Sequence, residues 1–229
     1  MNATMIVWNG IPALTRGVGI TLILVISSLC SGLLVGVGMG ISHVYAPRAI
    51  RAILSVLDRI LRGFPAIVLL FLLYFGLGSL PSISIPPLVA VITVLGLRSA
   101  AYQAQIYRGA LLMIDDSQLE AAHSLGMSLP RAVWSILLPQ AARFSIPSLS
   151  NEYSIVLKDT ALAFTVGVVD LMSRAKFLAL RSRETLLVYV IVACAYFILT
   201  HAGIALFRLL ERSIAIPGCG QTSSKGVVR

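Results

Sequence analysis

Long apolar runs alternate with short polar connections along this chain. Five runs reach the about 20 residues that a helix needs to cross the roughly 30 Å of hydrocarbon in a bilayer. They cover residues 17–43, 53–77, 86–107, 144–169 and 185–209. Arg59 and Arg62 interrupt the start of the second run, so its continuously apolar part begins near Phe64. The pattern predicts an all-α integral membrane protein with about five transmembrane helices.

Small residues recur at helical spacing in the first run. Gly32, Gly36 and Gly40 form two consecutive GxxxG spacings. Glycines at this spacing let two transmembrane helices approach closely. We therefore expect another helix to pack tightly against this face.

Composition and charge agree with a membrane protein. Only 12% of the residues are charged, whereas soluble domains average about 25%, so the apolar excess indicates a bilayer. A net charge of +9 would suggest nucleic acid in a soluble protein. Here the charges lie mainly between apolar runs, so membrane topology explains them and we expect no nucleic-acid partner.

The positive-inside rule gives an orientation. The first and third connections carry arginines, whereas the second, SLPSISIPP, carries no charge. We therefore expect an external N-terminal segment over residues 1–16 and a flexible internal tail over residues 213–229. One connection opposes this orientation, because it is basic and falls outside: Arg174, Lys176, Arg181 and Arg183.

A polar segment at 115–139 predicts two short helices joined by a turn. Ser117 and Glu120 have the S-x-x-E spacing of a capping box. Gly126 suits a left-handed helix end, Pro130 suits the first turn of a second helix, and Pro139 is expected to stop or kink that helix. A short, well-specified helix pair in a membrane protein indicates a docking element for a soluble partner.

This segment resembles the EAA loop of ABC importer permeases. Every defined position of the pattern, EAA, three residues, Gly, nine residues and I-x-L-P, is matched. The matching residues are Glu120, Ala121, Ala122, Gly126, Ile136, Leu138 and Pro139. Three further stretches are similar to the polar amino acid and opine branch of that family: LRGFPAIVLLFLLYFGL, AAYQAQIYRGAL and LPQAARFSIPSLSNEYSIVLKDTAL. The resemblance covers roughly residues 17–210.

The resemblance implies a type I (MetI-like) permease fold over residues 17–212, with cytoplasmic coupling helices. It implies a subunit that forms the path for polar amino acids or opine-like derivatives across the bacterial inner membrane. The implied partners are a dimer of ATP-binding subunits, a second permease chain, identical or homologous, and a periplasmic or lipid-anchored binding protein, besides membrane lipid. ATP and Mg would belong to the partners, and no cofactor is expected in this chain.

The fourth run carries polar residues on one face. At 100° per residue, an arc of about 120° holds Ser148, Asn151, Glu152, Lys158 and Asp159. Charges at membrane depth are costly and face a bundle interior or a water-filled path. Two interpretations stay open: a substrate path, and a structural ion pair between Lys158 and a carboxylate.

Other functional classes find little support. His43, His123 and His201 lie in separate segments, no CxxC pair exists, and no H-E-x-x-H or G-x-S-x-G pattern occurs. We therefore expect neither catalytic nor metal-ligating residues. The alternatives to an amino acid importer are a permease of the same type for another small solute and, with less support, a secondary transporter or channel.

Overall fold

The computed structural model describes residues 3–80 and 84–214, and every regular element in these ranges is a helix. The long helices are α1 (Ala3–Tyr45), α2 (Arg48–Gly63), α4 (Pro87–Leu112), α7 (Leu138–Asp159) and α9 (Thr185–Ile214). The shorter ones are α3 (Ala66–Phe71), α5 (Asp116–Ser124), α6 (Leu129–Ala132) and α8 (Leu171–Ser182). π-helical turns follow α3 at Leu72–Gly76 and α6 at Val133–Leu137, and 3₁₀ turns cover Leu77–Ser79 and Thr160–Val166.

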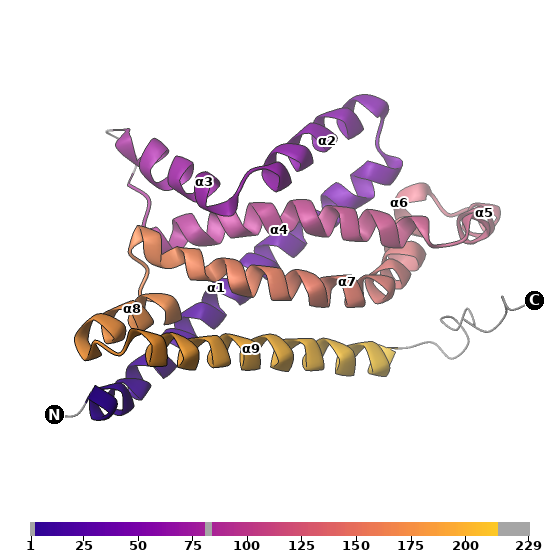
Figure 1. Cartoon of the computed structure of the whole chain (residues 1–229). Helices are drawn as coiled ribbons and strands as arrows, with labels where there is room; N and C mark the ends of the chain where they lie inside the picture. The colour runs from indigo at the N-terminus through magenta and orange to yellow at the C-terminus, as the bar shows by residue number, and fades with distance from the viewer. Residues whose placement is uncertain (1–2, 81–83, 215–229) are drawn as a thin grey trace, which may run out of the picture.

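The two ends of the bundle differ. Helices α4, α7 and α9 run side by side, and α1 crosses them diagonally (Figure 1). Helix α8 lies at the same end as the N-terminus, whereas α5, α6 and the C-terminal end of α9 lie at the other end (Figure 1). We call the latter the α5–α6 end.

Within residues 3–80 and 84–214, three helices are long and apolar enough to cross a membrane: Val7–Tyr45, Pro87–Leu112 and Thr185–Ser213. The expected fourth run does not meet the same criterion, because its polar face lowers its hydropathy. Helix α7 nevertheless has 22 residues, or about 33 Å, which is the length of a span. It ends at Asp159 and continues as a 3₁₀ turn to Gly167, whose φ of 93° reverses the chain.

The second expected run, 53–77, is divided rather than continuous. Helices α2 and α3 are bent by 101°, because Phe64 is extended and Pro65 follows it with no amide hydrogen to donate. Both helices contact α4, and they point away from each other on either side of the bend (Figure 1). The interruption expected from Arg59 and Arg62 is therefore a change of direction between two helices.

The first expected run, 17–43, lies within a longer helix. Helix α1 begins at Ala3 and has 43 residues, about 65 Å, so residues 3–16 continue the helix of the first run, and their expected external position stays a prediction. Most of the predicted tail, 215–229, lies outside the described residues. Helix α8 was not expected, and it forms the basic connection between α7 and α9.

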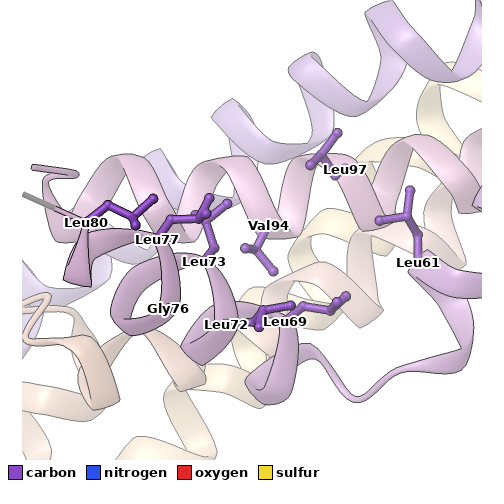
Figure 2. Close-up of a pocket in the computed structure, with 9 residues that line it drawn as sticks. All are labelled: Leu61, Leu69, Leu72, Leu73, Gly76, Leu77, Leu80, Val94 and Leu97. Carbon is purple, nitrogen blue, oxygen red and sulfur yellow. The ribbon is translucent and has the colours of Figure 1, made fainter. Parts of the chain in front are cut away.

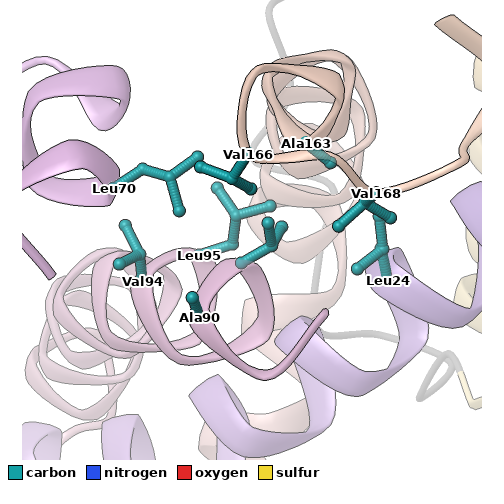
Figure 3. Packing of buried hydrophobic residues seen from close by; sticks show 9 residues of the cluster. Leu24, Leu70, Ala90, Val94, Leu95, Ala163, Val166 and Val168 are labelled. Carbon is teal, nitrogen blue, oxygen red and sulfur yellow. The ribbon is translucent and has the colours of Figure 1, made fainter. Parts of the chain in front are cut away.

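The predicted glycine seam is confirmed. A Cβ added to Gly32, Gly36 or Gly40 would lie 2.8 Å from an atom of α4. The backbones of α1 and α4 therefore approach closely along about two helical turns. Next to this seam, a buried apolar cluster joins α1, α3, α4 and the segment after α7 (Figure 3), and includes Leu24, Leu70, Val94 and Val166.

The seam gives a testable prediction. Gly36→Ala should lower the free energy of unfolding by about 1–3 kcal/mol, because its Cβ would meet Ala100 O and Gln103 Cβ at 2.8 Å. Gly38→Ala is the matched control, since a Cβ there meets nothing within 4 Å. Thermal unfolding of both variants in detergent tests this, and equal stability would contradict the packing.

Candidate functional site

Helix α5 begins at a cap that differs from the expected capping box. The Asp115 side chain accepts a 2.8 Å hydrogen bond from the Ser117 amide, which places Ser117 inside the first turn. Glu120 is exposed and does not take part in the cap, so its carboxylate is free to contact a partner. Hydrogen bonding from the Ser117 side chain and amide lowers the pKa of Asp115. The cap is therefore complete at neutral pH and is lost only when the pH falls through that lowered pKa.

Helix α5 ends as predicted. Gly126 has a φ of 77°, and its amide donates to His123 O at 2.9 Å, while the Met127 amide donates to Ala122 O at 3.0 Å. These two bonds form a Schellman motif, which fixes the direction of the chain after the helix. The turn to α6 is thus specified by backbone geometry.

Helices α5 and α6 and the π-helical turn after α6 present a mixed surface at the α5–α6 end. Glu120 and Ala121 are exposed beside Leu125, whose exposure is 82%. Trp134 is 63% exposed. Ala122 is buried instead, at 2%. A surface with an exposed carboxylate and large exposed apolar side chains is suited to a protein partner.

The rest of the matched pattern connects this surface to α7. Ile136 and Leu138 are half-buried, and Pro139 occupies the first turn of α7. Pro139 therefore does not stop the helix. The chain instead passes from α6 to α7 through the π-helical turn Val133–Leu137, where Val133 and Leu137 pack with Ala110, Leu111 and Ala141.

The charged face of α7 has a different partner from the one considered. Arg98 of α4 donates from Nη1 to Asp159 Oδ2 at 2.6 Å. Lys158 is exposed, and no ion pair involving it occurs among the described residues. The pairing of Lys158 with a carboxylate is therefore corrected to one between Arg98 and Asp159, 61 residues apart in the chain.

Glu152 lies next to this pair. It is 2% exposed, and its Oε1 has no hydrogen-bond partner in the described part of the chain. It lines a cavity of about 10 Å³ with Arg98, Ser99, Tyr102 and Asp159. This volume holds about one water molecule, so in this conformation the cluster is closed to a solute.

The five residues of the predicted face divide into two groups. Glu152 and Asp159 point toward α4 and share the small cavity, whereas Ser148, Asn151 and Lys158 are exposed. Sequence reasoning missed Arg98, because its position within an apolar run gives no sign of a partner on α7. Arg62 and Arg98 also lie 5.8 and 5.9 Å from the Tyr102 ring centroid, within cation–π range.

A larger cavity of about 560 Å³ lies between the end of α2, α3 and α4 (Figure 2). Its lining consists of leucines, one valine and one glycine: Leu61, Leu69, Leu72, Leu73, Gly76, Leu77, Leu80, Val94 and Leu97. It offers no polar side chain to a charged solute. The polar cluster of α4 and α7 is therefore the better candidate for solute contact.

A second polar network holds α2 to the bundle. Asp58 is the one buried residue of α2, and its Oδ2 contacts His43 Nε2 at 2.8 Å and accepts from Gln105 Nε2 at 2.5 Å. The network joins the end of α1, the middle of α2 and α4. His43 thus serves packing, and the described residues contain no group of three His, Cys, Asp or Glu side chains that could hold a metal.

Comparison with known proteins gives a consistent result. Residues 32–216 match the family model described as "Binding-protein-dependent transport system inner membrane component". The chain is 35% identical over 211 residues to the probable amino-acid permease YxeN of Bacillus subtilis, covering 91% of this chain and 94% of that one. It is 32% identical over 207 residues to the octopine transport system permease OccQ of Rhizobium meliloti, covering 86% and 87%.

The fold has a solved counterpart. The crystal structure of an amino acid ABC transporter with histidines includes a chain that superposes with a TM-score of 0.81. The two chains are 30% identical, over 92% of this chain and 97% of that one.

The Arg98–Asp159 pair gives a prediction about stability. The Asp159 and Arg98 side chains are 28% and 13% exposed, between an exposed and a buried ion pair. Asp159→Asn or Arg98→Met alone should therefore lower the free energy of unfolding by an intermediate amount. The loss should exceed the about 1 kcal/mol of an exposed pair and stay below the about 3–5 kcal/mol of a broken buried pair. The double variant should recover part of the loss. Lys158→Met should change the melting temperature little. If it lowered the melting temperature more than Arg98→Met, the data would favour an ion pair between Lys158 and a carboxylate.

Proposed function

The chain belongs to the family of binding-protein-dependent transport system inner membrane components, and from this premise we propose that it forms the solute path of an ATP-driven importer for polar amino acids or opine-like derivatives. The observation that carries the proposal is the match to this family over residues 32–216 together with relatives named for amino acids and octopine. The polar cluster between α4 and α7 supports the solute class, because it offers both signs of charge to a zwitterion.

Energy would come from a separate subunit. A permease of this family works with an ATP-binding subunit and a substrate-binding protein, so this chain would transport and not hydrolyse. We propose that a dimer of ATP-binding subunits docks on the surface formed by Glu120, Ala121, Leu125 and Trp134. The capped, short α5 supports this role, because a helix fixed at both ends transmits displacement without bending.

Orientation follows from the same surface. As a membrane permease, the chain would have its α5–α6 end in the cytoplasm and its N-terminus outside. Positive charge supports this, since the connections carrying Arg48, Arg51, Arg108 and Arg131 lie at that end. Lys176, over the Phe164 ring at 5.5 Å, belongs to the basic segment that would lie outside.

The path itself would involve both groups on α7. Glu152 and Asp159 face α4, whereas Asn151 and Lys158 are exposed. Exposed polar groups at membrane depth cannot face lipid without large cost. A second permease chain, identical or homologous, would cover them, and the solute would pass between the covered face and the opened cluster.

Docking can be separated from helix stability by mutation. Glu120→Ala should leave thermal stability within about 0.5 kcal/mol, as for a surface change, but should reduce co-purification of the ATP-binding subunit and solute uptake about tenfold or more. Glu184→Ala, an exposed carboxylate at the opposite end of the bundle, is the matched control.

Gly126 provides a second pair of variants. Gly126→Val should uncouple uptake, because a left-handed φ costs a residue with a Cβ about 1–2 kcal/mol, whereas Gly126→Asn should be tolerated. Normal assembly and uptake in both Glu120→Ala and Gly126→Val would rule out docking at this surface.

The path proposal predicts a loss of transport without a loss of folding. Glu152→Gln keeps the side-chain volume and removes the carboxylate. Because Glu152 Oε1 has no hydrogen-bond partner, the free energy of unfolding should not fall. Uptake of radiolabelled glutamine, arginine and octopine by the reconstituted complex should fall about tenfold. Lys158→Met should not restore it, because Lys158 is not the partner of Glu152. Wild-type uptake with Glu152→Gln would exclude Glu152 from the path.

A further inference from the structure

Arg62, in the last turn of α2, has no carboxylate partner in the described part of the chain. Its Nε is buried and has no hydrogen-bond partner there. Its guanidinium carbon lies 5.8 Å from the centroid of the Tyr102 ring on α4. The neighbouring Leu61 and Leu97 line the leucine cavity, which offers no polar side chain. The transport path proposed above does not use this cation.

The depth of Arg62 makes an unpaired charge costly. Helix α2 ends beside the middle of α4 (Figure 1), because the chain bends at Phe64 and Pro65. Tyr102 precedes the end of α4 at Leu112 by 10 residues, about 15 Å, so Arg62 lies at membrane depth rather than beside lipid headgroups. An ionisable side chain at such depth faces a partner or a water-filled path and indicates a functional site.

Arg62 and the polar cluster share Tyr102, which lines the small cavity together with Glu152. Within the cluster, Arg98 already pairs with Asp159. One cation and one carboxylate are then left without an ion pair among the described residues, Arg62 and Glu152. These two charges complement the carboxylate and the ammonium of an α-amino acid.

Helix α2 is held on α4, so we expect Arg62 to keep its position when the cluster opens. Asp58, one turn before Arg62, contacts His43 Nε2 at 2.8 Å and accepts from Gln105 Nε2 at 2.5 Å. This network connects α2 to α1 and α4, which pack closely along the glycine seam. Glu152 lies on α7 instead. A solute that enters between α4 and α7 would therefore meet Arg62 on one wall and Glu152 on the other.

Building on the proposed function, we propose that Arg62 binds the α-carboxylate of the transported solute. Its guanidinium donates two parallel hydrogen bonds to the carboxylate oxygens beside the Tyr102 ring, while Glu152 accepts from the ammonium. Arg98 and Asp159 neutralise each other and leave this recognition to the unpaired charges. A lipid phosphate is the alternative anion, but phosphates lie beyond the hydrocarbon and Arg62 lies within it.

Solute binding to the purified complex of permease and ATP-binding subunits tests this assignment. The binding protein is left out, because it would recognise the solute independently. The probes are radiolabelled glutamine, arginine and octopine, and each solute that binds is competed with its unlabelled carboxylate and its α-carboxamide. The wild-type complex should prefer the carboxylate about tenfold or more, which is the contribution of a charged hydrogen bond.

Arg62→Met should weaken solute binding about tenfold or more and should bring the carboxylate and the carboxamide to equal affinity, because only the carboxylate uses the lost cation. Arg62→Lys should retain part of the preference, since it keeps the charge but not the paired donors. Arg59→Met removes an exposed arginine from the preceding turn of α2 and is the matched control, with both affinities unchanged. Arg62→Gln replaces Arg62→Met if the methionine variant does not assemble.

Three outcomes would overturn the inference while wild-type binding stands. Arg62→Met could retain the preference for the carboxylate, or it could weaken both forms by the same factor, as a purely structural role would. The third is a lipid phosphate at Arg62, seen as phosphatidylglycerol that the variant loses in native mass spectrometry with solute affinity unchanged. Failure of all three solutes to bind the wild-type complex would instead contradict the proposed function and, with it, this inference.

Discussion

The close contact between α1 and α4 fixes the geometry on which the polar groups depend. Three glycines let the backbone of α4 approach α1 so closely that Gln103 reaches Leu29 O at 3.1 Å. Once that face of α4 is held, its other faces are fixed too. Arg98 then lies against Asp159 of α7, and Gln105 lies against Asp58 of α2. One helix therefore sets the positions of three neighbours.

Burial of charge then limits what the cluster can do. Charged side chains are costly to expose to the hydrocarbon of a bilayer. Here Arg98, Glu152 and Asp159 line a cavity that holds about one water molecule. A zwitterionic solute can enter only if α4 and α7 separate. If the cluster is the proposed solute path, we expect α7 to move, because α4 is held by α1. The closed cluster would then be one state of a site that opens by displacement of α7.

The sequence predicted the features that depend on neighbouring residues and missed those that depend on contacts between distant parts of the chain. The apolar runs, the left-handed Gly126 and the glycine seam follow from composition and spacing alone. The cap of α5 was misassigned to Ser117, because Asp115 offers an equally good acceptor two residues earlier and only the backbone geometry distinguishes them. Arg98 was missed, because a partner 61 residues away leaves no periodic signal. Helix α8 was missed although its buried Leu171, Ala175, Leu178 and Ala179 recur at helical spacing, because its basic residues were taken as a connection between two spans.

A continuous helical backbone connects the proposed docking surface with the polar cluster. Glu152 follows Leu138 by 14 residues along one helix, about 21 Å, and α7 joins α6 through a π-helical turn without a loop. π-helical turns within helices recur at functional sites, where the register of the backbone changes. A displacement of α5 and α6 would therefore reach Glu152 through the α7 backbone. The Tyr153 contact with Gly203 lies one residue beyond Glu152, so under the proposed docking we expect it to be the pivot about which the α5–α6 end of α7 moves relative to α9.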